Sequence, residues 1–403
     1  MREQPAAAGP DAIYRRFPTC RQMRRYAARR MPKFAYDFVD TGAELELGVR
    51  RNAEAFDAIE LMPRFGATPQ DPLTAAELFG RSYALPVGVA PMGLTGLAWP
   101  GADLHLAQAA QHARIPYVLA TGSTISIERA AHIAPDVFWF QLYRMPRDNH
   151  ALGLDLVRRA RDAGAHVLVL TLDSAAPPKR PRDLKNGLVP PFRLTPRMAL
   201  QAALAPAWLL ALARHGLPRF ENVVPYLARP TNPWRTGAFV VREVTGAFDW
   251  DEVARIRALW PRALVVKGLM HPADAERAVA LGADGIWVSN HGARVFDPAP
   301  ASVSALPDIV AAVRGAATVL VDGGVRSGID VVRARALGAA AAFAGRAFMF
   351  ATAALGAAGP GHMIRLMADD IRHTLQFLGA AGIDEVTANV LAGARHSQFS
   401  RRS

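Results

Sequence analysis

Eight short apolar runs recur along this 403-residue chain, and stretches with helical spacing of apolar residues lie between them. The runs are continuous rather than alternating, which indicates strands buried on both faces, as in a parallel sheet. The predicted strands cover residues 85–90, 117–120, 137–141, 167–171, 264–267, 285–289, 318–321 and 340–344. The clearest predicted helices cover residues 103–114, 151–163, 272–281 and 329–337. Eight strand–helix repeats predict an α/β fold, a closed (β/α)8 TIM barrel.

The barrel does not account for the whole chain. We expect one domain over residues 1–403, in which residues 1–84 form a helical N-terminal extension and residues 85–380 form the barrel. Residues 174–249 form a long, proline-rich insertion after strand four, and an excursion of this length is usually a functional lid or disordered. A doubly wound sheet is disfavoured, because no glycine-rich dinucleotide turn or P-loop is present.

The chain is strongly basic at its start. Its net charge is +12, and residues 1–33 carry nine Lys and Arg against Glu3 and Asp11. Such a face could meet nucleic acid, anionic lipid or an acidic partner, or it could simply be a solvated surface. The nine residues are Arg2, Arg15, Arg16, Arg21, Arg24, Arg25, Arg29, Arg30 and Lys33.

An apolar segment covers residues 198–213, between Arg197 and Arg214. It is shorter than the ~20 residues that a spanning helix needs. It therefore suits a segment in a membrane interface or a buried loop helix. The single cysteine, Cys20, excludes an intramolecular disulfide and a cysteine-based metal site, and no apolar secretory signal follows Met1. We expect a cytoplasmic protein, peripheral on the inner face of the membrane if it meets lipid.

Active sites of TIM barrels lie where strands end and loops begin, so polar residues at strand ends are the candidates. Loops after strands seven and eight commonly hold phosphate, since glycines expose backbone N–H groups and arginines add charge. This predicts a phosphate site at Asp322, Gly323, Gly324, Arg326, Gly345 and Arg346.

The other strand ends carry groups suited to acid–base chemistry on an anion. Lys267 could form a Schiff base or face an electron-rich ring. His291 could act as a base held by Asp173, because a carboxylate orients an imidazole and stabilises its charged form. Arg180 and Arg294 could clamp a substrate carboxylate. No metal site is expected, since no second histidine or carboxylate cluster accompanies His291.

These residues fall in motifs that resemble the FMN-dependent 2-hydroxy-acid oxidase and dehydrogenase family, which includes glycolate oxidase, L-lactate dehydrogenase and mandelate dehydrogenase. The resemblance covers residues 19–380. Its most specific stretch is SNHGAR at 289–294, followed by Asp297. It is reinforced by FQLY at 140–143, RPRDLKN at 180–186, VVKG at 265–268 and DGGVR at 322–326.

The resemblance implies a role for each position. His291 takes a proton from the substrate, paired with Asp173, while Tyr143 bonds the substrate near the reacting oxygen. Arg180 and Arg294 bind the substrate carboxylate. Other residues would contact FMN: Pro91, Met92, Gly93, Gln141, Thr171, Lys267 and Ser289 along the ring, and the six phosphate-site residues along the ribityl chain and phosphate.

Several positions differ from those common in the family. Phe38 stands where a tyrosine usually contacts the substrate carboxylate, which removes a hydrogen bond worth about 0.5–1.5 kcal/mol. Gly122 replaces a large aromatic residue of glycolate oxidases and implies a roomier pocket. Gly93, where many oxidases have alanine, is similar to mandelate and lactate dehydrogenases.

The expected activity is therefore FMN-dependent oxidation of a small L-2-hydroxy acid, lactate- or mandelate-like, with electrons passed to a quinone, a cytochrome or another carrier. One alternative is an oxidase that reduces O2 to H2O2. Another is a non-redox, phosphate-binding lyase or isomerase that uses Lys267. The resemblance also implies a homo-oligomer, a tetramer, and no nucleic-acid partner.

Overall fold

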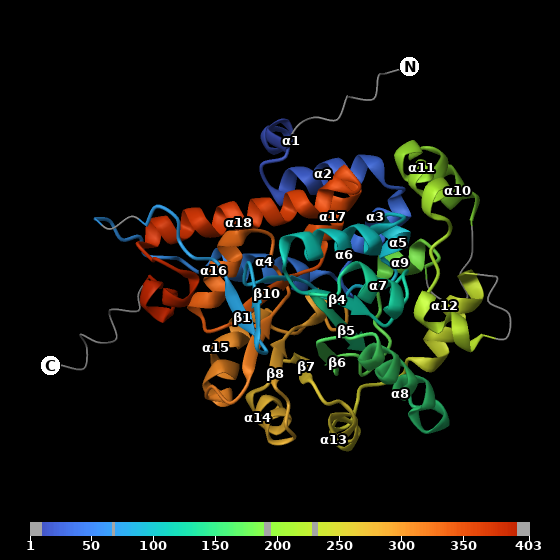
Figure 1. Cartoon of the computed structure of the whole chain (residues 1–403). Coiled ribbons are helices and arrows are strands. Elements are labelled where there is room, and N and C mark those ends of the chain that lie inside the picture. The colour runs from blue at the N-terminus through green and yellow to red at the C-terminus, as the bar shows by residue number, and fades with distance from the viewer. Residues whose placement is uncertain (1–9, 67–68, 189–194, 228–232, 393–403) are drawn as a thin grey trace.

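A closed barrel of eight parallel strands forms the centre of the computed structural model, which describes residues 10–66, 69–188, 195–227 and 233–392 (Figure 1). The strands follow one another around the barrel, and the last closes onto the first where Ala342 pairs with Val87. They are β3 (Val87–Val89), β4 (Tyr117–Ala120), β5 (Phe138–Leu142), β6 (Val167–Thr171), β7 (Ala263–Leu269), β8 (Gly285–Val288), β9 (Thr318–Val321) and β10 (Ala341–Ala344). Each corresponds to one predicted strand, so the predicted TIM barrel is confirmed.

Helices alternate with the strands and cover the outside of the barrel. They are α5 (Thr95–Ala98), α6 (Ala102–Ala113), α7 (Ile127–Ile133), α8 (Arg147–Asp162), α13 (Trp250–Leu259), α14 (Pro272–Ala280), α15 (Ser302–Val313), α16 (Gly328–Ala336), α17 (Arg346–Leu355) and α18 (Ala358–Leu378). The four predicted helices match α6, α8, α14 and α16. Residues 148–150 of α8 have left-handed backbone angles, so its regular part begins at residue 151, as predicted.

The interior of the barrel is packed with large aromatic side chains. Trp139, Trp287 and Phe343 are fully buried, and the rings of Trp287 and Phe343 lie 4.1 Å apart. Gly88 is needed beside them, because a Cβ atom there would come within 2.1 Å of the Phe343 ring. The interior is thus a filled core, and chemistry is confined to the loops at the strand ends.

The N-terminal extension is mainly helical, with α1 (Pro10–Arg16), α2 (Cys20–Arg30), α3 (Lys33–Asp40) and α4 (Leu47–Asp57). It also contains a hairpin, β1 (Ala76–Leu78) and β2 (Arg81–Tyr83), which the prediction of a helical extension did not include. The hairpin turns at Phe79 and Gly80, both left-handed, as a two-residue turn requires. It packs on the barrel core, where the Tyr83 hydroxyl accepts a 3.0 Å hydrogen bond from Trp139 Nε1.

The insertion after β6 is built from short helices. They are α9 (Pro181–Lys185), α10 (Pro196–Ala203), α11 (Pro206–His215), the 3-10 helix η1 (Glu221–Tyr226) and α12 (Pro233–Glu243). Its four α-helices begin at proline. Proline suits the first turn of a helix because its fixed φ is helical and an N–H at that position would have no partner within the helix. The apolar segment 198–213 is broken before Pro206 and divides between α10 and α11. Among the described residues, no helix has the length and apolarity needed to cross a bilayer.

Candidate active site

The ends of β4, β5 and β6 are joined by buried hydrogen bonds between their side chains. Gln141 Nε2 donates to Thr171 Oγ1 at 2.9 Å, and Gln141 Oε1 accepts from the Thr121 backbone N–H at 3.2 Å. Thr121 Oγ1 donates to the Gln141 carbonyl at 2.7 Å. The predicted ring-lining residues Gln141 and Thr171 therefore lie side by side in fixed orientations.

A second chain of contacts joins the ends of β7, β8 and β9. Lys267 is buried, and its Nζ donates to Ser289 Oγ at 2.8 Å. Ser289 Oγ donates to Asp322 Oδ1 at 2.5 Å, and Asp322 Oδ2 lies 3.4 Å from Lys267 Nζ. These contacts pair a buried lysine with a carboxylate, as a buried cation requires.

His291 lies between a carboxylate and a phenol. Its Nδ1 is 2.8 Å from Asp173 Oδ1, and its Nε2 is 3.2 Å from the Tyr143 hydroxyl. Burial opposes ionisation of Asp173, but the charges of His291 and Lys267 outweigh it and hold the Asp173 pKa below its ordinary value. Asp173 is thus an anion that can orient the imidazole and stabilise its protonated form.

The backbone that carries His291 is strained. His291, Gly292 and Ala293 all have φ near +60°, in the left-handed region. Asn290 holds this turn, because its Oδ1 accepts from the Ala293 N–H at 3.1 Å and its Nδ2 donates to Asn52 Oδ1 of α4 at 2.7 Å. Residues other than glycine adopt left-handed backbone angles only where their surroundings fix them, and such residues concentrate at functional sites.

Asp173 can approach His291 because a glycine follows Lys267. Gly268 has φ +101°, and a Cβ atom there would lie 2.7 Å from Cβ and Cγ of Asp173. The glycine of the VVKG motif is therefore required by the packing of the carboxylate at the end of β6.

Arg180 and Arg294, the predicted carboxylate clamp, lie within electrostatic range of each other and of Tyr143. Arg180 Nε is 2.9 Å from Asp183 Oδ2, a carboxylate that burial holds with a raised pKa. Burial lowers the pKa of Arg294 to about 9, and the repulsion of Arg180 acts in the same direction. Two guanidinium groups close enough to repel each other form a site for an anion.

Phe38 lies directly against Arg294. The Arg294 guanidinium is 5.4 Å from the centre of the Phe38 ring, and its Nη1 donates to the backbone carbonyls of Phe38 and Thr41 at 2.9 and 3.0 Å. The N-terminal extension thus touches the site at the position where the family has a tyrosine.

Arg326, in the loop after β9, and Arg346, the first residue of α17, are half-buried. Arg346 donates to the carbonyls of Val39, Gly292 and Thr41 at 2.7–3.0 Å. Burial lowers the pKa of both arginines; the repulsion of Arg294 and Arg326 lowers that of Arg346 further, whereas the attraction of Asp330 partly opposes the effect of burial on Arg326. No described carboxylate forms an ion pair with Arg294, Arg326 or Arg346.

The excess of positive charge on these three arginines shows whether the site fits a phosphorylated cofactor. Burying cations without a counter-charge is costly, and neutral carbonyls offset only part of that cost. A phosphate group at the ends of β9 and β10 would supply the missing negative charge, so the residues present fit FMN.

The remaining predicted cofactor residues lie around the mouth of the barrel. Pro91 and Met92 are half-buried and Gly93 is exposed after β3. Gly345 faces Met92, whose Sδ would be 3.2 Å from a Cβ atom there. Gly323 and Gly324 are left-handed, and Gly324 also packs closely against the Asn52 carbonyl and the Phe56 ring of α4. Among the described residues, no group of three or more His, Cys, Asp and Glu side chains could hold a metal ion.

Comparisons with known proteins agree with this geometry. A model of the FMN-dependent dehydrogenase family matches residues 27–393. The chain belongs to this family. It is 36% identical to (S)-mandelate dehydrogenase of Pseudomonas putida, over 91% of this chain and 92% of that protein. It is 37% identical to L-lactate dehydrogenase of Pectobacterium atrosepticum, over 91% of this chain and 95% of that one.

A solved structure described as the monotopic membrane protein (S)-mandelate dehydrogenase superposes with a TM-score of 0.88, at 36% identity, over 93% of this chain and 98% of the other. The predicted membership of the family that oxidises 2-hydroxy acids, with FMN as cofactor, is thereby confirmed. This membership replaces the alternative of a non-redox lyase or isomerase that uses Lys267.

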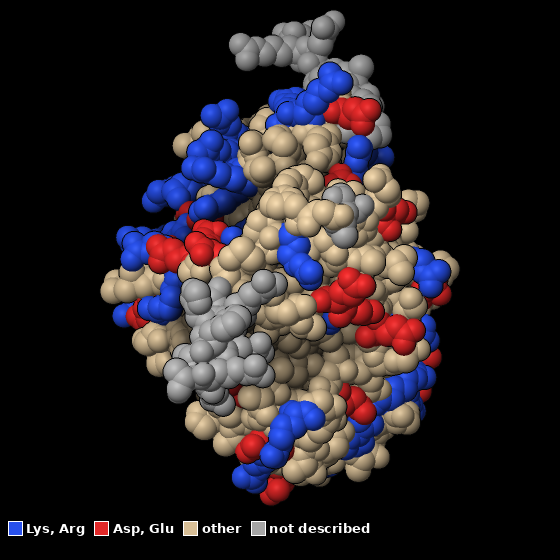
Figure 2. All heavy atoms as spheres, turned by 90° about the vertical axis from the view of Figure 1, so that its left-hand side faces the viewer, with Lys and Arg blue, Asp and Glu red and all other residues tan. Residues whose placement is uncertain are grey.

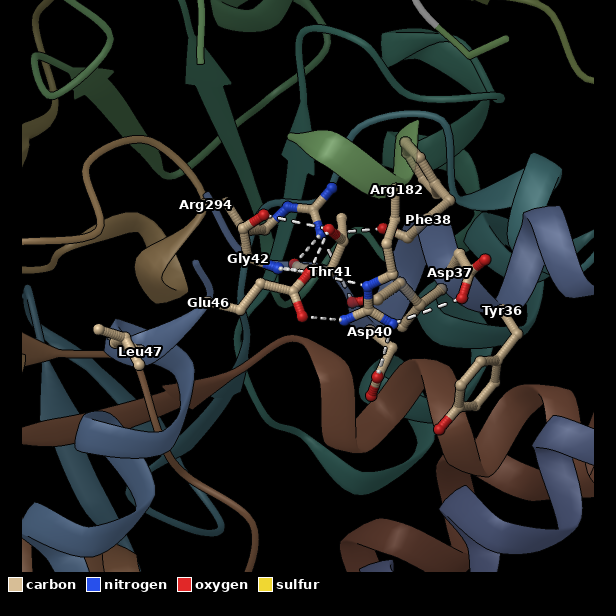
Figure 3. A network of polar contacts seen from close by, with 12 residues as sticks. Tyr36, Asp37, Phe38, Asp40, Thr41, Gly42, Glu46, Leu47, Arg182 and Arg294 are labelled. Atoms are coloured by element: carbon tan, nitrogen blue, oxygen red, sulfur yellow. Dashed lines mark hydrogen bonds and ion pairs between the residues drawn. The ribbon is translucent and has the colours of Figure 1, made fainter. Parts of the chain in front are cut away.

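Sequence reasoning missed a network of ion pairs next to the site. Arg182 of α9 binds both carboxylate oxygens of Glu46 at 2.7 Å and also lies 3.0 Å from Asp40 and 3.4 Å from Asp37 (Figure 3). Glu46 accepts in turn from Thr41 Oγ1 at 2.8 Å. The network joins the helix that follows Arg180 to the segment whose carbonyls bind Arg294 and Arg346. Arg182 lies inside the quoted 180–186 motif, but its partners are about 140 residues away in sequence.

We predict that Arg182 and Glu46 are energetically coupled. In a double-mutant cycle of Arg182→Ala and Glu46→Gln, the free energy of unfolding should show a coupling of about 1 kcal/mol, because the pair is bidentate and partly buried. Arg182→Ala should also raise the substrate KM, since Arg180 lies two residues away.

The matched control is the exposed Arg158–Asp155 pair on α8, whose side chains are 63% and 34% exposed. Its coupling should be only a few tenths of a kcal/mol. Equal coupling in both cycles would contradict the inference that Arg182 holds the two segments together.

Proposed function

We propose that this FMN-dependent dehydrogenase oxidises an L-2-hydroxy acid of the lactate or mandelate type to its 2-oxo acid, and passes the electrons to a quinone or another carrier. The observation that carries the proposal is the placement of Asp173, His291 and Tyr143 in one hydrogen-bonded line next to Arg180 and Arg294. The relatives named mandelate and L-lactate dehydrogenase support this class of substrate. Stoichiometric release of H2O2 in air would contradict the proposed acceptor.

In this proposal the two arginines bind the substrate carboxylate, and His291 removes a proton from the substrate. Asp173 stabilises the resulting imidazolium, and the Tyr143 hydroxyl donates a hydrogen bond near the reacting oxygen. Burial raises the pKa of Tyr143, so it remains a protonated donor. FMN, when bound, accepts the two electrons that leave the α-carbon.

The excess of positive charge at the ends of β9 and β10 also supports the placement of FMN. Arg326 and Arg346 would hold the FMN phosphate, with Gly323, Gly324 and Gly345 exposing backbone near it. Lys267 would face the pyrimidine edge of the ring and stabilise negative charge there, while Gln141, Thr171 and Ser289 would bond to the ring. Asp322 would hold the ribityl chain.

We expect His291→Ala to retain FMN but to lose reduction by substrate. The rate of anaerobic flavin bleaching by L-lactate or (S)-mandelate should fall by roughly 10²- to 10⁴-fold, the range contributed by a positioned base. The control is His132→Ala, an exposed histidine on α7. Bleaching at the wild-type rate in His291→Ala would refute the role of the histidine.

We also propose that one side of the molecule lies on an anionic membrane surface. The segment of α10 and α11 presents exposed leucines, with Leu204 between the two helices at 73% and Leu210 on α11 at 64% exposure. On α2, Arg21, Arg25 and Arg29 are exposed at four-residue spacing, and none forms an ion pair with a described residue.

Both sets of helices lie on the upper side of the molecule in Figure 1. On the face seen in Figure 2, basic side chains gather toward the same upper end, where α1 and α2 lie. Apolar side chains next to unpaired arginines are typical of a surface that lies in a lipid interface. The solved relative is described as monotopic, which supports this placement. Of the nine basic residues predicted to form this face, Arg2 lies outside the described residues.

The expected result is co-sedimentation with vesicles that contain anionic lipid, and weak binding to neutral vesicles. The double variant Leu204→Asp and Leu210→Asp should lose most of this binding, because charge replaces the apolar contact. Activity with a soluble dye should stay unchanged. Leu259→Asp, at an exposed position of α13 on the opposite side, is the control. Equal binding of all three proteins would exclude this surface.

A further inference from the structure

The insertion after β6 returns to the barrel mouth and is fixed there by one buried amide. Asn222 Nδ2 donates to the carbonyls of Ala120 and Thr121 at 3.3 and 3.2 Å, and to Ser123 Oγ at 3.1 Å. Its Oδ1 accepts from the Ile127 N–H at 2.9 Å. These four hydrogen bonds span the loop that joins β4 to α7. This part of the insertion is therefore a fixed element of the site and not a free lid.

The anchor places an aromatic ring over a glycine. A Cβ atom on Gly122 would lie 3.2 and 3.3 Å from two atoms of the Phe220 ring and 3.7 Å from Gly93 Cα. The direction in which a side chain of Gly122 would point is thus taken by Phe220. The space that the sequence implies at Gly122 is partly filled by a residue from the insertion.

The Phe220–Gly122 contact lies next to the segment that carries the groups proposed to react. Thr121, next to Gly122, accepts at Oγ1 a 3.1 Å hydrogen bond from the Tyr143 N–H. The Tyr143 hydroxyl lies 3.2 Å from His291 Nε2. Gly93 is exposed at the barrel mouth and Phe220 is half-buried, so the Phe220 ring lies beside backbone that carries no side chain.

We propose that Phe220 forms the wall against which the side chain of the substrate packs, and that it sets the preference for 2-hydroxy acids with an aryl or large alkyl group over those with a methyl group. The inference rests on the proposed function. An aromatic ring favours aryl groups through offset or edge contacts. Gly93, which is exposed, has no side chain to restrict the other side of such a planar group.

The test compares kcat/KM for (S)-mandelate and L-lactate in Phe220→Ala and Phe220→Leu. In Phe220→Ala the mandelate-to-lactate ratio should fall about three- to tenfold, the size of one lost aromatic pair, mainly through the KM for mandelate. The ratio in Phe220→Leu should lie between that of the wild type and that of Phe220→Ala. Phe377→Ala, which removes an aromatic ring from an exposed position of α18, is the control and should leave the ratio unchanged.

The ratio separates specificity from folding, because partial loss of folded enzyme lowers both activities equally. If Phe220→Ala fails to fold, the Phe220→Leu ratio decides. An unchanged ratio in an active, FMN-loaded variant would overturn the inference. Failure of the proposed function is a different result, since the wild-type flavin would then not be bleached by any 2-hydroxy acid.

Discussion

Positive charge half-buried at the barrel mouth is the constraint on which the rest of this structure depends. Arg294, Arg326 and Arg346 are only partly accessible to water, and no described carboxylate forms an ion pair with them. Such charge is stabilised by groups aimed at it or by a bound anion. Carbonyls of residues 38–41 accept hydrogen bonds from Arg294 and Arg346, and the phosphate of FMN together with a substrate carboxylate would supply the anions. The N-terminal extension thus contributes to the proposed site, because it carries those carbonyls.

The groups proposed to react are held in place by contacts within the protein. His291 sits in a left-handed turn that Asn290 and Asn52 fix, and Gly268 allows Asp173 to come within 2.8 Å of the imidazole. The packing around the turn stabilises it against this backbone strain. Fixed dipoles and charges of this kind need no reorganisation during the reaction, which is the main source of electrostatic stabilisation in enzymes. Lys267 is fixed in the same way, by its contacts with Ser289 and Asp322.

Much of the barrel could be predicted because buried parallel strands are continuously apolar, and each strand end marks the active face. Asp173, Lys267 and His291 were predicted by position alone, and the structure brings them together. The partners of Arg182 and the Phe220–Gly122 contact could not be predicted, since each contact joins segments about 100 residues or more apart in sequence and no motif marks Asp37, Asp40, Glu46 or Phe220. The hairpin 76–83 was missed for a different reason: its two strands are too short to show a pattern. The length of the proline-rich insertion suggested a lid or disorder, but several of its prolines begin short helices.

The most direct test of the account is the affinity of the cofactor-free protein for FMN against that for riboflavin, which lacks the phosphate. If the half-buried Arg326 and Arg346 bind a phosphate, FMN should bind at least a hundredfold more tightly, because two charge-assisted contacts at about 1.5–3 kcal/mol each would be lost with riboflavin. Replacing Arg346 with alanine should remove much of that difference. Equal affinity for the two flavins would contradict the central claim.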